Sequence, residues 1–210
     1  MKKTNWLAAA CLTALLASCQ CNEQKCCDDS KYPNAVIESI MERRSIRKYQ
    51  DRAVPRETLQ LLAECGVNAP NAMNKQRWQV RIVDNAAYID GITDVYKKHN
   101  PKAAADTNIK NMFRNAPAVI FVASNGEGMT EIDCGLLGQN IMLAAQSIGL
   151  GTCCLGSAAA FMNSNADAAP YVQQLDLPEG YKLLYAIAVG YPDEHPDAKP
   201  RDLTKIKFVD

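Results

Sequence analysis

An uninterrupted apolar run at residues 118–123 (AVIFVA) places the strongest constraint on the fold of this chain. It follows Pro117 directly, and its length and lack of alternation are typical of a strand that is buried on both faces. Residues 183–190 show the same pattern near the C-terminus. We therefore expect other elements to cover both faces of these strands.

Helices and further strands are expected around these two runs. Strands are predicted over residues 78–84 and 151–155, and helices over residues 86–98, 107–114, 131–148 and 166–175. Two more helices begin at residues suited to a helix start, namely Asn34, a good N-cap, and Pro55. Gly66 and Gly149 stand where the second and the longest helix should end, and a break is expected at residues 100–101.

The composition is that of a globular protein with a single domain. Hydrophobic residues make up 48% of the chain, which is enough for a substantial core at this length. Lys and Arg together number 23, as do Asp and Glu, and no block of five like charges occurs, which argues against nucleic-acid binding. The elements alternate without a regular βαβ order and no strand leads into a G-x-G-x-x-G turn, so a Rossmann site is not supported.

The N-terminal residues have the character of an export signal. Lys2 and Lys3 precede an apolar run, residues 6–17, that is too short to span a bilayer. The segment LASC that ends it resembles the bacterial lipobox, in which the cysteine, here Cys19, carries lipid after cleavage. A buried N-terminal helix is the alternative. Three regions are expected: a signal peptide at residues 1–18, a flexible cysteine-rich tether at residues 19–31, and a domain at residues 32–210 that is exported and lipid-anchored to a bacterial membrane, facing the periplasm or the cell surface.

Nine cysteines are many for 210 residues. Cys21, Cys26 and Cys27 lie in the polar tether, where they could pair with one another or bind a soft metal as thiolates. Their C-x4-C-C spacing lacks the C-x2-C pairs and histidines of a zinc site, and neighbouring cysteines do not easily bridge each other, so no metal site is predicted. The domain's cysteines stand in apolar surroundings and are predicted to be small core residues: Cys65, Cys134, Cys153 and Cys154.

A basic segment at residues 43–49 (RRSIRKY) carries the most chemical interest. Guanidiniums give paired hydrogen bonds to phosphate, and the hydroxyl of Ser45 and backbone N–H groups add neutral donors. The alternative is a solvated helix end, where the helix dipole favours cations. Two further patches favour an anion site: the amide segment at residues 68–78 (NAPNAMNKQRW), and Lys199 with Arg201 near the C-terminus.

These segments resemble those of the FMN-dependent nitroreductase family. The most specific parts are R-R-S-x-R-x-Y in the basic segment and A-P-N-A-x-N-x-Q-x-W in the amide segment, and residues 149–156 (GLGTCCLG) are similar to the family's glycine-containing turn beside the flavin. The resemblance extends from about Asn34 to Arg201. It implies an α+β fold with a central, mainly antiparallel sheet flanked by helices, assembled as an intertwined homodimer that holds two FMN molecules at its interface.

The resemblance also implies which residues contact FMN. The residues that would hold or flank the phosphate are Arg43, Arg44 (mainly through its backbone), Ser45, Lys199 and Arg201. Arg47 would lie by the ribityl chain and pyrimidine edge of the flavin as an electrostatic stabiliser. The remaining contacts would be Leu155 and Gly156, packed on the ring, and Pro70, Asn71 and Asn74 from the other subunit.

What the resemblance implies for activity is a ping-pong oxidoreductase. The sequence has no paired carboxylates and no Ser/His/Asp arrangement, and His99 and His195 stand in polar surroundings that suggest surface positions. The chemistry would then belong to FMN rather than to a catalytic side chain. NAD(P)H or another donor would reduce it, and a nitroaromatic, a quinone or a related electron-poor acceptor would oxidise it. Loops and the region of residues 88–114, which matches the family least, would line the acceptor pocket.

Three features depart from the family pattern. Arg77 stands where a proline usually precedes the tryptophan, and Cys153 and Cys154 replace bulkier residues beside the flavin, which leaves room for a thiol role. An exported protein would also meet little dissolved NAD(P)H. The leading alternative is a non-enzymatic lipid-anchored protein that keeps the fold and binds flavin or metal through its pocket or tether. A second alternative keeps FMN for another reaction, such as dehalogenation or enone reduction.

Overall fold

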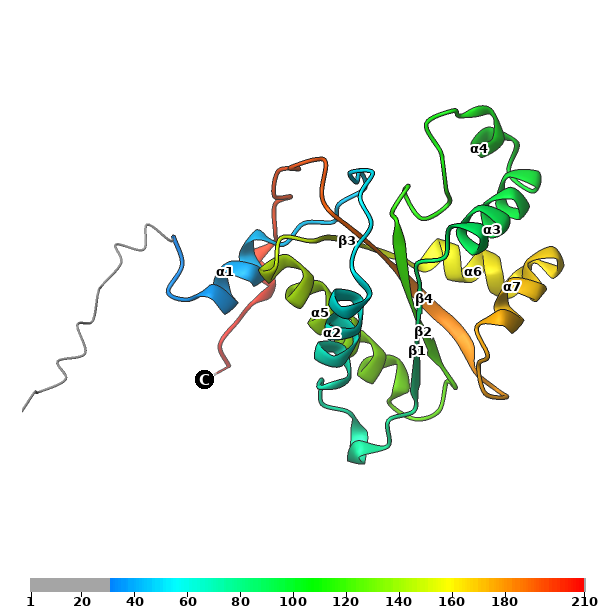
Figure 1. The fold of residues 1–210 in the computed structure, drawn as a ribbon. Helices are drawn as coiled ribbons and strands as arrows, with labels where there is room; N and C mark the ends of the chain where they lie inside the picture. The colour runs from blue at the N-terminus through cyan, green and yellow to red at the C-terminus, as the bar shows by residue number, and fades with distance from the viewer. Residues whose placement is uncertain (1–30, 210) are drawn as a thin grey trace, which may run out of the picture. The chain divides into compact units, whose positions relative to one another are not determined.

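Four antiparallel strands form the central sheet of the structure, a computed structural model that describes residues 31–209 (Figure 1). The strands are β1 (Trp78–Val83), β2 (Ala118–Ser124), β3 (Gly151–Leu155) and β4 (Lys182–Gly190), in the order β1-β2-β4-β3. The two strands with continuous apolar sequence, β2 and β4, are the central pair, and every residue of β2 is buried. The expectation of a mainly antiparallel sheet with buried central strands is confirmed.

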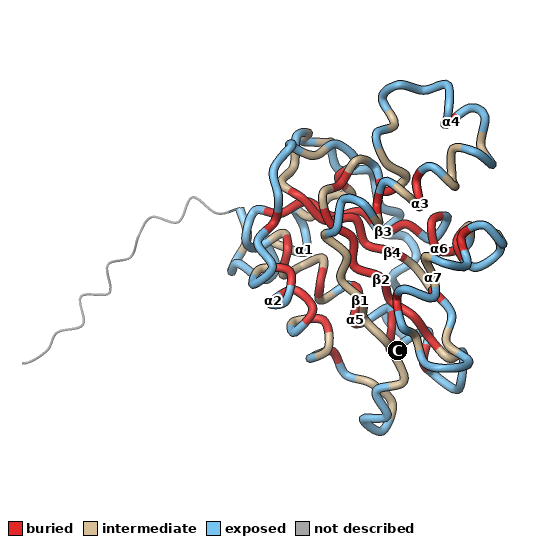
Figure 2. Tube along the Cα trace, turned by 45° about the vertical axis from the view of Figure 1, so that its right-hand side comes forward, coloured by how far each residue is buried: buried red, intermediate tan, exposed pale blue. Residues whose placement is uncertain are grey.

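Helices cover both faces of this sheet. They are α1 (Ala35–Glu42), α2 (Arg56–Val67), α3 (Ala86–Lys98), α4 (Pro101–Ala105), α5 (Thr130–Ser147), α6 (Gly156–Ser164) and α7 (Ala169–Gln174), with short 3-10 turns η1 (Ala72–Asn74), η2 (Ala166–Ala168) and η3 (Leu203–Lys205). α2 and α5 pack on one face and α3, α6 and α7 on the other (Figure 1), and buried residues concentrate in the sheet and along the helices beside it (Figure 2). Side chains of β2 alternate between these layers, with Ile120 and Val122 on the α5 side and Val119 and Phe121 on the α6 side.

The chain divides into two units between Lys31 and Tyr32. The predicted signal peptide at residues 1–18, the lipidation site at Cys19 and the tether up to residue 30 lie outside the described residues. Within residues 31–209, none of the helices combines the length and the apolar character that crossing a membrane requires.

Several helices begin or end where the sequence has a residue suited to a helix boundary. The Asn34 side chain accepts hydrogen bonds from the N–H groups of Val36 and Ile37 at 3.0 Å and so caps α1. Pro55 directly precedes α2. Gly149 follows α5 with a φ of +77°, a left-handed conformation that glycine adopts without strain. These predicted boundaries are confirmed.

The prediction of a helix over residues 107–114 is wrong, because that part of the chain is a loop of turns and bends. The side-chain oxygens of Asn111 and Asn115 accept hydrogen bonds from four backbone N–H groups of the loop, which competes with helical bonding. The predicted break lies between α3 and α4, where Asn100 caps the new helix and Pro101 opens it. The sequence analysis also missed α6, which follows β3 without a linker and has no capping side chain.

Candidate functional site

The basic segment lies along the outer edge of β3. Ser45 pairs with Thr152 in a parallel bridge, and the backbone N–H of Ile46 donates to the Thr152 carbonyl at 2.9 Å. The Ile46 side chain is buried against Gly151, where an added Cβ would stand 2.8 Å from it. Its neighbours Ser45 and Arg47 stay half-buried and exposed, respectively. The buried isoleucine therefore fixes the segment while the polar side chains on either side of it remain accessible.

The side chains of Tyr49 and Glu194 form further hydrogen bonds with the backbone of the basic segment. The Tyr49 hydroxyl donates to the Ile46 carbonyl at 2.7 Å, and the Glu194 carboxylate accepts a hydrogen bond from the Arg47 backbone N–H. Burial raises the pKa of Tyr49 well above its usual value, so its hydroxyl stays protonated and keeps donating at neutral pH. The backbone that carries Arg47 is therefore tied to both neighbouring parts of the chain.

The basic side chains differ in how many hydrogen bonds they make within the described chain. The Arg44 guanidinium donates to the carbonyls of Met41 and Arg43, and Arg47 donates one N–H to the Ser45 carbonyl at 3.1 Å. Among residues 31–209, no hydrogen bond or ion pair engages the Arg43 guanidinium or the Ser45 hydroxyl. The segment therefore presents donors that the described part of the protein does not satisfy, while Arg44 is bound within its own turn.

A further arginine reaches this end of the sheet from the loop before β2. Arg114 is exposed, and three residues later Pro117 packs with Tyr49 against Gly190. A Cβ on Gly190 would stand 2.7 Å from Pro117 and 2.8 Å from Tyr49, so only glycine permits both contacts. The loop and the basic segment therefore meet over the last residue of β4.

Three arginines act electrostatically on one residue of β3. Burial raises the pKa of Cys153 on β3, and the positive charges of Arg47, Arg114 and Arg43 oppose that rise. The sequence analysis missed Arg114 as a candidate contact and expected only that residues 88–114 line the acceptor pocket. No local signal indicates it, because its proximity to Arg47 depends on tertiary packing.

The end of β3 carries the two candidate ring contacts. Leu155, its last residue, is buried, and Gly156 begins α6 and is exposed. Apart from its chain neighbours and the backbone of its own helix, no atom of the described residues lies within 4 Å of the position that a Cβ on Gly156 would take. The surface over Gly156 is therefore accessible to a planar ligand.

The amide segment is an ordered loop between α2 and β1. Asn71 and Asn74 belong to the turn at η1, and Pro70 before them is exposed. The carboxylate of Asp133, a buried residue of α5, accepts a hydrogen bond from the Ala72 N–H at 3.2 Å. The sequence analysis missed Asp133, which holds the candidate amides in place through the backbone.

The strand register shows that the amide segment and the basic segment lie far apart in one chain. β1 starts opposite Ser124, the last residue of β2, whereas the basic segment adjoins the row formed by Ala118, Val189 and Thr152 at the other end. Six residues at about 3.3 Å each give a separation of about 20 Å along β2. Figure 1 shows η1 and the basic segment at opposite ends of the sheet. One chain therefore does not bring these two segments together.

The C-terminal candidates are exposed. Arg201 donates to the carbonyl of Lys199 at 3.0 Å, and both side chains are open to solvent. Within the described chain, no hydrogen bond or ion pair joins either residue to Arg43. Their contribution to an anion site stays a prediction.

Comparison with known proteins assigns the fold and the motifs to one family. The model of the nitroreductase family matches residues 40–191. The chain belongs to the nitroreductase family. Over 170 residues it is 32% identical to a Methanothermobacter thermautotrophicus protein provisionally named NADH dehydrogenase/NAD(P)H nitroreductase, covering 78% of this chain and 81% of that protein. It is 28% identical to the NADPH-flavin oxidoreductase of Vibrio harveyi, covering 80% and 70%.

A solved nitroreductase supports the same assignment. The crystal structure of a Desulfitobacterium hafniense nitroreductase with bound FMN superimposes with a TM-score of 0.75 at 27% identity, covering 85% of this chain and all of that one. The groups that this nitroreductase-family chain presents fit such a cofactor. The donors at Arg43 and Ser45, which residues 31–209 leave without partners, suit a phosphate, and the open surface at Gly156 suits a flat ring.

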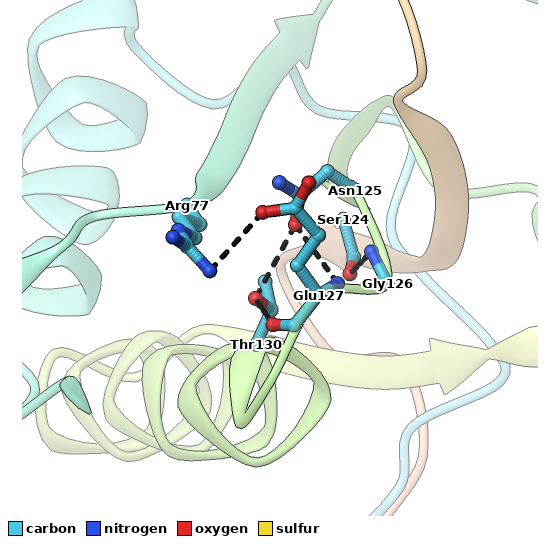
Figure 3. A network of polar contacts seen from close by, with 6 residues as sticks. All are labelled: Arg77, Ser124, Asn125, Gly126, Glu127 and Thr130. Carbon is cyan, nitrogen blue, oxygen red and sulfur yellow. Dashed lines mark hydrogen bonds and ion pairs between the residues drawn. The ribbon is translucent and has the colours of Figure 1, made fainter.

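Arg77, which departs from the nitroreductase pattern, forms an ion pair instead of a proline turn. Its guanidinium lies 3.1 Å from the carboxylate of Glu127, in the loop between β2 and α5 (Figure 3). The hydroxyl of Thr130, at the start of α5, donates to the Asn125 side chain and the Glu127 carbonyl of that loop. The ion pair therefore ties the start of β1 to an ordered loop.

Cys153 and Cys154, the second departure, point to opposite faces of β3. Cys153 is buried among core residues on the α6 side, whereas Cys154 is exposed. Both are free thiols, and desolvation by the surrounding protein raises the pKa of each, of Cys154 although its side chain reaches the surface. The prediction of a small core residue is confirmed for Cys153 and for Cys134, whereas Cys65 is half-buried and the prediction is wrong for Cys154. Raised pKa values do not favour a thiolate role for either residue of the pair at neutral pH.

Two cavities of the described chain lie near the candidate contacts, and Arg44 is the one candidate contact that lines either of them. One of about 500 Å³ is lined by Arg44, Ile46 and Glu194, on the edge of the basic segment. The other, of about 570 Å³, lies between β1 and α7 and is lined by Arg56, Asp84 and Tyr171. Neither cavity is lined by Arg43 or Gly156.

Proposed function

We propose that this protein is an FMN-dependent oxidoreductase that passes electrons by a ping-pong mechanism from NAD(P)H or another donor to a nitroaromatic, a quinone or a related electron-poor acceptor. The observation that carries the proposal is the group of donors at Arg43 and Ser45, next to Arg47, that no residue of the described chain satisfies, in a chain of the nitroreductase family. The names of the relatives, an NADPH-flavin oxidoreductase and a nitroreductase with bound FMN, support it.

The cofactor contacts follow from the donors and from the family pattern. Arg43 and Ser45 would bind the phosphate, with Lys199 and Arg201 added from the C-terminal segment. Leu155 and Gly156 would lie against the ring. Arg47 would lie at the pyrimidine edge, where its backbone is held by Glu194.

FMN, when bound, supplies the hydride and electron transfer itself. The task left to the protein is to hold the donor and acceptor in turn over the ring and to stabilise negative charge as it accumulates. A fixed guanidinium such as that of Arg47 does this with less reorganisation than water. The histidines do not enter this account: His99 pairs with Asp167 at 2.9 Å on the surface, and His195 is exposed.

A homodimer would complete the site. The amide segment lies about 20 Å along β2 from the basic segment, so its asparagines would serve the site of a second copy. Large apolar side chains are exposed on α1, on α5 and near the C-terminus, including Val36 (67%), Ile132 (55%), Leu136 (43%) and Phe208 (97%). We propose that a second copy of this chain covers these side chains and supplies the amide segment.

The lipobox-like sequence supports a location of the proposed enzyme outside the cytoplasm, with lipid on Cys19 as its anchor. Dissolved NAD(P)H is scarce there, so the physiological donor would be a different reduced carrier. The ability to accept electrons from NAD(P)H in solution is a separate property, which purified protein tests directly.

Anaerobic rapid mixing tests the proposed reaction. FMN-loaded protein mixed with NADH or NADPH alone should lose the visible absorbance of oxidised flavin, and the band should return when a nitroaromatic or a quinone is added. Loss of the band only when donor and acceptor are present together would contradict the ping-pong order. Bound flavin that dithionite reduces but no biological donor reduces would favour the non-enzymatic alternative.

A further inference from the structure

The loop at residues 106–117 is held in one conformation by its own side chains. Besides the four hydrogen bonds that Asn111 and Asn115 accept, their amide groups donate to two further carbonyls of the loop, at 3.1 and 2.7 Å. Phe113 is fully buried, with its ring centroid 5.7 Å from that of Phe121. The backbone on both sides of Arg114 is therefore fixed.

Arg114 itself has an unfavourable backbone conformation. Its φ is +62° and that of Asn115 is +64°, in the left-handed region that asparagine tolerates and arginine rarely adopts. Such strain costs on the order of 1 kcal/mol or more and persists only where the surroundings enforce it. The Arg114 guanidinium makes no hydrogen bond or ion pair with any of residues 31–209. The protein thus holds a strained backbone to present a charge that the described chain does not use.

The charged side chains that act on Cys153, Arg114 among them, are mostly cations. The charged side chains that act on Cys153 are three guanidiniums, from Arg47, Arg114 and Arg43, and one carboxylate, from Glu194. That carboxylate already accepts the backbone N–H of Arg47. Three of the four charged side chains that act on Cys153 are therefore cations, a local setting that suits an anionic ligand.

We propose that Arg114 is a second flavin-contacting cation, beside Arg47, and that it stabilises bound FMN more in its reduced, negatively charged form than in its oxidised form. The inference rests on the proposed function and adds a residue from a loop expected only to line the acceptor pocket. A cation fixed in advance by its loop stabilises developing charge without rearrangement. Its consequence is a higher midpoint potential of the bound cofactor.

Equilibrium redox titration of the full-length protein tests this inference. The midpoint potential is measured for the wild type, Arg114→Gln, Arg114→Lys and Lys110→Gln, each at saturating FMN. Lys110→Gln is the matched control, because it removes a positive charge from the same loop at an exposed residue that is not among the charges acting on Cys153. Far-UV circular dichroism and thermal unfolding establish that each variant is folded.

We expect Arg114→Gln to weaken binding of reduced FMN about tenfold more than binding of oxidised FMN, which lowers the two-electron potential by about 30 mV. Arg114→Lys should recover most of this shift, and Lys110→Gln should match the wild type. An unchanged potential in Arg114→Gln overturns the inference, as does an equal shift in Lys110→Gln or a folded Arg114→Gln that no FMN concentration saturates. A wild type that binds no FMN defeats the proposed function instead.

Discussion

The backbone N–H of Ile46 donates to the carbonyl of Thr152 at 2.9 Å, and this bond joins the basic segment to the edge of the sheet. It sets Ser45 beside β3 and leaves Arg47 exposed next to it. The position of the candidate phosphate donors therefore depends on the packing of one buried isoleucine.

Replacing Gly151 by alanine should disturb this anchor. The added Cβ would stand 2.8 Å from the Ile46 side chain, so we expect Gly151→Ala to lower the free energy of unfolding by about 1–3 kcal/mol and to weaken FMN binding. Denaturant unfolding and FMN titration measure the two effects. Gly156→Ala is the matched control for stability, since beyond its chain neighbours and its own helix backbone its Cβ meets no described atom within 4 Å. Equal stability of Gly151→Ala and wild type would contradict the packing argument.

Arg47→Ala should weaken FMN binding without unfolding the domain. The side chain is exposed and makes one hydrogen bond to the Ser45 carbonyl, so its loss should change the stability of the apoprotein by less than about 0.5 kcal/mol. Loss of a charged contact to the cofactor should raise the Kd for FMN about tenfold or more. Lys48→Ala removes an exposed positive charge from the same segment and should leave the Kd near that of wild type. An unchanged Kd in Arg47→Ala would remove this residue from the site.

The proposed dimer can be tested on the exposed face of α5. Leu136 is 43% exposed, and burying a glutamate there between two copies should dissociate them. We expect Leu136→Glu to be monomeric by sedimentation velocity and to bind FMN weakly, because the amide segment of the second copy is lost. Ala104→Glu on α4, an equally charged change at another exposed residue, should stay dimeric. A Leu136→Glu dimer with full FMN affinity would exclude this face from the interface.

Lipid anchoring predicts a fractionation result. Expression of Cys19→Ala in a bacterial host that processes lipoproteins should move the protein from the membrane fraction to the soluble fraction. Cys21→Ala, two residues later in the tether, should remain with the membranes. Retention of Cys19→Ala in the membrane fraction would show that another element anchors the chain.

Local and periodic signals predicted most of the fold, and tertiary contacts explain the misses. The strand at residues 118–123 and the caps at Asn34 and Gly149 follow from hydrophobicity, side-chain bonding and backbone freedom. The helix predicted over residues 107–114 is absent because asparagine side chains bind the backbone of the loop. α6 was missed because nothing in its first turn marks a helix start.

The candidate site was only partly visible in the sequence. The basic segment was recognisable because its arginines and serine are consecutive or nearly so. Two residues come close to the basic segment only in the folded chain. The loop that carries Arg114 packs over Gly190, and Glu194 accepts a hydrogen bond from the backbone of Arg47. Neither contact can be predicted from spacing in the sequence. The separation of about 20 Å between the amide and basic segments likewise becomes apparent only from the strand register.

A heterodimer complementation measurement tests the central claim, that the basic segment of one chain and the amide segment of another form one FMN site. Two differently tagged variants are combined: Arg43→Ala, and Asn71→Ala with Asn74→Gly, in which glycine suits the positive φ of residue 74. We expect each variant alone to bind FMN at least tenfold more weakly than the wild type, and the purified heterodimer to bind one FMN per two chains with wild-type affinity. A heterodimer that binds FMN as weakly as its parents would contradict the shared site.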